Sequence, residues 1–174
     1  MTNGVRDAMA RFYTERAPKM DMPKPKKKRK SSDPISEERI QNRVVVALRR
    51  NGCFVFSIPL GGKRDVIAAS RLKRSGALRG TPDLCILNSP CPEFKGVFWE
   101  LKVEKGRVSD EQISFLNRSA ELGFLSVVAS GLKANLQLVE VLYGTKNGTK
   151  KTKEEILQGI EETDGVQVFD GVPR

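Results

Sequence analysis

Two short apolar segments joined by a loop with two prolines constrain the fold of this chain most strongly. The first is Leu84–Leu87, which follows Asp83, and the second is Val97–Val103. Short apolar runs bounded by turn residues are typical of buried strands, and this pair predicts a hairpin. Glu100 and Lys102 stand two residues apart on the second strand, so their side chains point to the same face.

Segments on either side of the hairpin alternate between strand and helix patterns. Strands are predicted over 53–58 and 124–129, and helices over 36–50, 65–75, 109–122 and 132–143. The first helix has Ser36 and acidic residues at its start, and Asn51 and Gly52 at its end. Ser109 and Gln112 have the spacing of a capping box, and Ile113, Leu116 and Ala120 are expected to form the apolar stripe of that helix.

The order of these elements predicts an α/β fold, with a mixed central sheet flanked by helices. The domain is expected to span residues 36–143. Residues 1–35 are predicted to be a disordered basic N-terminal arm, and residues 144–174 a flexible C-terminal tail in which 153–162 could form a short helix.

The composition excludes several kinds of catalytic site. The chain has no histidine, which removes Ser-His-Asp triads, histidine general bases and histidine-containing zinc fingers. Its three cysteines, Cys53, Cys85 and Cys91, are odd in number and favour free thiols in a reducing compartment. Because no apolar run approaches the roughly 20 residues of a membrane span, an intracellular protein with no membrane-spanning segment is expected.

The formal net charge is +10, and both the N-terminal arm and the domain are basic. A polyanionic partner is the natural inference, with nucleic acid first and an anionic membrane surface second. The basic run Pro25–Lys30 has two interpretations: a flexible arm that binds phosphates, or a nuclear localisation signal. The first fits the cytoplasm of a bacterial or phage-infected cell, and the second fits a eukaryotic nucleus.

Basic residues are dense on both sides of Asp83 and Glu100. A solvated helix face and a surface that contacts DNA phosphates both account for them. The candidate DNA-binding residues are Lys63, Arg64, Arg71, Lys73, Arg74, Arg79, Lys105 and Arg107.

Asp83, Glu100 and Lys102 together suggest phosphodiester chemistry. Two carboxylates on neighbouring strands can hold a hard cation such as Mg²⁺, and the backbone carbonyl of Leu101 could supply a further ligand. Lys102 could orient the attacking water, help to deprotonate it, or neutralise charge on the phosphate. Taken singly, each residue is also explained by an ordinary turn cap or surface ion pair.

The chain resembles the VRR-NUC family of the PD-(D/E)XK nuclease superfamily, especially its small stand-alone members from phages and bacteria, over residues 36–130. The segments that carry the resemblance are Glu38–Gln41, Pro59–Arg64, Leu78–Asp83, Glu100–Lys102 and Lys105–Gln112. It implies a restriction-endonuclease-like core and DNA cleavage that depends on Mg²⁺ or Mn²⁺. It also implies a homodimer that acts on branched DNA such as Holliday junctions.

The resemblance also implies roles for single residues. Asp83 and Glu100 would be metal ligands, Lys102 the catalytic lysine, Glu38 an active-site acid and Gln112 an active-site helper. Two other functions remain open at this stage: a DNA-binding or recombination-accessory protein that does not cut, and a restriction-type nuclease that reads a sequence.

Overall fold

The computed structural model describes residues 35–58, 70–71, 74–144 and 151–170. Its centre is a five-stranded sheet in the order β1-β2-β3-β4-β5, in which β3 and β4 are parallel and the other pairs antiparallel. The strands are β1 (Val55–Ser57), β2 (Leu84–Ile86), β3 (Val97–Lys102), β4 (Leu125–Ser130) and β5 (Val166–Phe169). The helices that lie wholly within the described residues are α2 (Glu37–Arg50), α4 (Asp110–Glu121), α5 (Gly131–Tyr143) and α6 (Lys153–Glu161).

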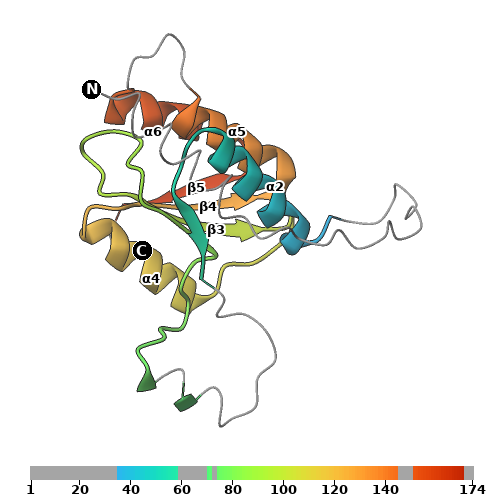
Figure 1. Ribbon diagram of the computed structural model, residues 1–174, viewed down its shortest axis with the longest axis vertical. Coiled ribbons are helices and arrows are strands. Elements are labelled where there is room, and N and C mark those ends of the chain that lie inside the picture. Colours follow the sequence, from blue (N-terminus) through green and yellow to red (C-terminus); the bar gives the residue numbers. More distant parts are fainter. Residues whose placement is uncertain (1–34, 59–69, 72–73, 145–150, 171–174) are drawn as a thin grey trace, which may run out of the picture.

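Helices cover both faces of the sheet, as the α/β pattern predicts (Figure 1). Helices α2, α5 and α6 lie over one face, and α4 lies over the other. Successive side chains of β3 point to opposite faces of the sheet. Trp99 and Leu101 belong to the main core, whereas Phe98 packs in the smaller cluster that includes Leu116 of α4. By the same alternation Glu100 and Lys102 face the α4 side.

Helix α2 forms as the sequence predicts. The hydroxyl of Ser36 accepts a hydrogen bond from the backbone N–H of Arg39, and the helix ends at Asn51. Gly52 follows with φ of +73°, a conformation that glycine adopts without steric cost. Ile40 and Val44 on its apolar stripe are buried against the sheet.

The predicted hairpin is confirmed, because β2 and β3 pair antiparallel with Leu84 opposite Trp99. The predicted stripe of α4 is partly wrong, since Ile113 is exposed and the buried positions are Leu116 and Ser119. Ser119 is tolerated in the core because its hydroxyl bonds the hydroxyl of Ser126 on β4 at 2.7 Å. A buried polar pair of this kind gives no apolar signal in the sequence.

The C-terminal segment is not a flexible tail over residues 151–170, which corrects the prediction for 144–174. Helix α6 buries Ile156 and Ile160 in the main core. Strand β5 then pairs antiparallel with β4 and extends the sheet, and Phe169 packs with the cluster under α4. Charged residues surround these few apolar positions, so the sequence pattern does not indicate that they belong to the core.

Most of the predicted helix 65–75 lies outside the described residues, of which Ser70, Arg71 and Arg74 are helical. The predicted arm 1–35 also lies outside them, except for Ile35. Within the described ranges, no helix has the length and apolar character needed to cross a membrane.

Replacing Ile156 by alanine should destabilise the whole domain, because the side chain is fully buried between α6 and the main core. The expected loss in the free energy of unfolding is about 2–5 kcal/mol, measured by urea denaturation. Glu154→Ala, an exposed change on the same helix, should cost well under 1 kcal/mol. Equal and small effects of the two substitutions would mean that α6 is not part of the cooperative core.

Candidate active site

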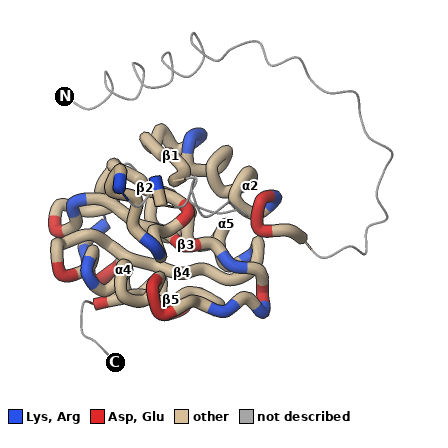
Figure 2. The backbone as a smooth tube through the Cα atoms, turned by 90° about the horizontal axis from the view of Figure 1, so that it is seen from below, with Lys and Arg blue, Asp and Glu red and all other residues tan. Residues whose placement is uncertain are grey.

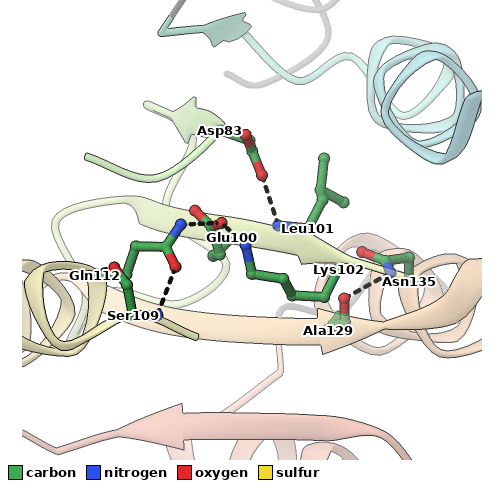
Figure 3. Close-up of polar contacts among 8 residues, drawn as sticks. All are labelled: Asp83, Glu100, Leu101, Lys102, Ser109, Gln112, Ala129 and Asn135. Atoms are coloured by element: carbon green, nitrogen blue, oxygen red, sulfur yellow. Dashed lines mark hydrogen bonds and ion pairs between the residues drawn. The ribbon is translucent and has the colours of Figure 1, made fainter. Parts of the chain in front are cut away.

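Strand β3 carries a buried ion pair on its α4 side. The Nζ atom of Lys102 donates to Oε1 of Glu100 at 2.6 Å (Figure 3). Only 2% of Glu100 and 9% of Lys102 is exposed. A charged pair this deeply buried costs desolvation free energy, so it points to a chemical use rather than to stability alone.

Gln112 joins this pair from the first turn of α4. Its Nε2 group donates to Oε1 of Glu100, while its own Oε1 accepts the backbone N–H of Ser109 at 2.9 Å. The Ser109 hydroxyl in turn accepts the backbone N–H of Gln112, which completes the predicted capping box. Gln112 therefore caps the helix and also contacts Glu100, and its role in an active site stays a prediction.

Asp83 reaches β3 from the start of β2. Its Oδ2 atom accepts the backbone N–H of Leu101 at 2.9 Å (Figure 3). The N–H and C=O of one strand residue point to the same side, so the Leu101 carbonyl is directed toward the Asp83 side of β3. Asp83, Glu100 and the Leu101 carbonyl thus come from adjacent strands, as the sequence pattern predicts.

Gly80 lets the chain before Asp83 pass close to α4. Its φ is +75°, and a Cβ at this position would lie 2.6 Å from the backbone nitrogen of Gln112 and nearer still to the Glu111 carbonyl. Any side chain here would collide with backbone atoms that cannot move aside. The loop that leads into β2 is therefore packed directly against the first turn of α4.

Burial dominates the electrostatics of both acids. It raises the pKa of Glu100 to about 7, although the hydrogen bond from Lys102 opposes the shift, and the nearby charge of Asp83 adds to it. Burial also raises the pKa of Asp83, against the lowering effect of the Leu101 N–H. Oε2 of Glu100 is buried and has no hydrogen-bond partner. The positive charge near the two carboxylates is thus too small to offset the cost of burying their ionised forms.

A hard divalent cation would fit this donor set. It would satisfy the unpartnered Glu100 oxygen and favour the ionised form of both acids. The described residues hold no group of three or more His, Cys, Asp or Glu side chains that could bind a metal ion. Two carboxylates and a carbonyl suit Mg²⁺, which usually keeps several of its waters.

The family resemblance implies Glu38 as an active-site acid, and that role stays a prediction. Glu38 is exposed, as is its neighbour Glu37, and it stands two residues before Ile40, off the apolar stripe of α2. Glu37 precedes Ile40 by three residues and so extends that stripe beyond the end of the core. Its charge contributes to the raised pKa of Asp83. The spacing of three residues from Glu37 to Ile40, and of four from Ile40 to Val44, was the signal in the sequence.

The candidate DNA-binding residues are only partly described. Arg71, Arg74, Arg79, Lys105 and Arg107 are exposed, whereas Lys63, Arg64 and Lys73 lie outside the described residues. Figure 2 shows basic positions on several elements, with acidic positions interspersed. The exposed residues are free to meet a phosphate backbone, but their contact with DNA remains a prediction.

The raised pKa of Glu100 should make stability depend on pH when no divalent ion is present. Between the ordinary value of 4.5 and the folded value of about 7, the folded protein binds this proton more tightly than the unfolded chain. The free energy of unfolding should therefore fall as the pH rises from 5 to 7, at up to about 1.4 kcal/mol per pH unit.

Urea denaturation at several pH values in EDTA measures this slope. In Glu100→Gln the neutral amide cannot titrate, so the slope over pH 5–7 should be smaller than in the wild type. The same slope in both proteins would show that Glu100 ionises with an ordinary pKa.

Comparison with known proteins gives a likeness in fold. No protein-family model matches the sequence, and no curated protein matches it. A solved structure described as "VRR_NUC domain protein" is similar, with a TM-score of 0.54 and 20% identity. The match covers 68% of this chain and 98% of that one. At this identity the likeness concerns the fold, so the chain has a VRR-NUC-like, restriction-endonuclease-like α/β fold.

Proposed function

We propose that this protein is a DNA endonuclease that hydrolyses phosphodiester bonds and depends on Mg²⁺ or Mn²⁺. The observation that carries the proposal is the buried, unpartnered Oε2 of Glu100 beside Asp83 and Lys102. A fold similar to that of a VRR_NUC domain protein supports a nuclease-type function.

In this proposal, Asp83, Glu100 and the Leu101 carbonyl hold the metal ion. When bound, the ion lowers the pKa of a water and polarises a phosphoryl oxygen. The Leu101 N–H fixes Oδ2 of Asp83, and Gln112 fixes Oε1 of Glu100, so both carboxylates are oriented before the substrate arrives. The first turn of α2 adds Glu37, whose charge increases the attraction for a cation.

Lys102 is the group that meets the reacting phosphate. Its ammonium group lies against Glu100, with a small exposed fraction that a phosphate can approach. From there it orients the attacking water or neutralises the charge that builds on the phosphate. The chain has no histidine to act as a general base, and Lys102 is the group that we propose helps to deprotonate the water.

The substrate class follows from charge and from the resemblance. The net charge of +10 and the exposed Arg79, Lys105 and Arg107 favour a polyanion near the site. Branched DNA and a homodimer are the forms that the family resemblance adds to the proposal. A protein of this fold that binds DNA without cutting is the competing function, and the same assay separates the two.

Cleavage of four-way junction, flap and linear duplex DNA tests the function. The wild type should cut the branched substrates in Mg²⁺ or Mn²⁺ and not in EDTA. Asp83→Ala and Lys102→Ala should each lower the rate by about 100-fold or more, because each removes a group that acts on the metal or the phosphate. Binding without cutting by the wild type would favour the accessory function, and equal cutting by the variants would refute the site.

The two acids at the start of α2 form a matched pair for a further test. Glu37→Gln removes the charge that acts on Asp83, whereas Glu38→Gln removes a neighbouring charge off the core-facing stripe. The first change should weaken Mn²⁺ binding in a calorimetric titration by several-fold, and the second should leave it near the wild-type value. A larger loss of Mn²⁺ affinity in Glu38→Gln than in Glu37→Gln would identify Glu38 as the active-site acid.

A further inference from the structure

We infer that the capping box of α4 is also the device that orients the metal-binding carboxylate, with Gln112 as its positioning residue. The inference rests on the proposed function, because it explains how Glu100 is held ready for a cation. The Gln112 side chain makes two interactions, the helix cap and the hydrogen bond to Glu100. Only the cap can be recognised from the spacing of Ser109 and Gln112 in the sequence.

The structure contains a second capping box that shows what the motif needs by itself. In α6 the Thr152 hydroxyl accepts the backbone N–H of Glu155 at 3.2 Å, and Glu155 accepts the Thr152 N–H at 2.8 Å. A carboxylate at the third helical position is sufficient there, because the box requires only an acceptor. Helix α6 lies on the opposite face of the sheet from α4 (Figure 1).

In α4 the same position carries the side-chain amide of Gln112, whose oxygen and nitrogen both make hydrogen bonds. The backbone N–H of Ser109 can only donate, so the oxygen of the Gln112 amide must face it. The NH₂ end is thereby turned toward Glu100, where it donates to Oε1. A glutamate at position 112 would still cap the helix, but it would place a second carboxylate oxygen against Glu100 and offer no donor.

This arrangement decides which oxygen of Glu100 is available. Oε1 accepts from both Lys102 and Gln112, which fixes the rotation of the carboxylate and leaves Oε2 without a partner. The first turn of α4 is itself held against the loop before Asp83, because Gly80 contacts it closely. One helix start therefore sets the position of both acids.

A matched pair of substitutions separates positioning from capping. Gln112→Met and Glu155→Met each remove the acceptor of a capping box and replace it by an uncharged side chain of similar length. Only the first also removes the donor to Glu100. Ser109→Ala is the third variant, because it removes the hydroxyl half of the α4 box and keeps the Gln112 amide.

The measurements are the affinity for Mn²⁺ by calorimetry, kcat and KM on junction DNA, and the melting temperature. Gln112→Met should weaken Mn²⁺ binding by about 10-fold or more and lower kcat by a similar factor, with little change in KM. Glu155→Met should show a comparable fall in melting temperature, with wild-type Mn²⁺ affinity and kcat. Ser109→Ala should lose far less Mn²⁺ affinity than Gln112→Met.

Wild-type Mn²⁺ affinity in Gln112→Met would overturn the inference, and so would an equal loss of affinity in Ser109→Ala, because capping alone would then explain the effect. Failure of the proposed function would give a different result from failure of this inference. A wild type that binds Mn²⁺ without cutting DNA refutes the nuclease, while the comparison of Mn²⁺ affinities among the variants still tests the inference.

Discussion

The buried carboxylate of Glu100 is the constraint on which the arrangement of the site depends. It stands on the central strand β3 under α4, where water cannot solvate its charge. Lys102 and Gln112 both donate to one oxygen, yet burial still raises the pKa to about 7. A carboxylate held in this state gains most from a cation, because ionisation and metal binding then favour each other.

The other face of β3 makes that strand rigid. The indole N–H of Trp99 donates to Oδ1 of Asn135 on α5 at 2.9 Å. The Asn135 amide donates in turn to the carbonyl of Ala129 at 2.9 Å (Figure 3), and to the carbonyl of Gly131 at 2.7 Å. All of these polar atoms are buried and partnered, so the network fixes β3, β4 and α5 relative to one another. A site that needs oriented carboxylates benefits from a support of this kind.

Local chemistry explains which elements the sequence predicts well. The hairpin of β2 and β3, the cap of α2 and the capping box of α4 all depend on residues within a few positions of each other, and all are confirmed. The errors share a different cause. Ser119 and the residues of α6 and β5 are buried through partners distant in the chain, so their local patterns look polar or weak.

By itself, the sequence determined the α/β class, the strand pair that carries Asp83, Glu100 and Lys102, and the absence of histidine chemistry. Alternation along a strand and capping at a helix start are local rules, and they hold wherever the element lies. Only the tertiary structure decided that the charge of Glu37 acts on Asp83, and that the Gln112 amide reaches Glu100. Those outcomes depend on how α2 and α4 pack against β3, and packing between distant segments sets burial, and with it pKa and the direction of each donor.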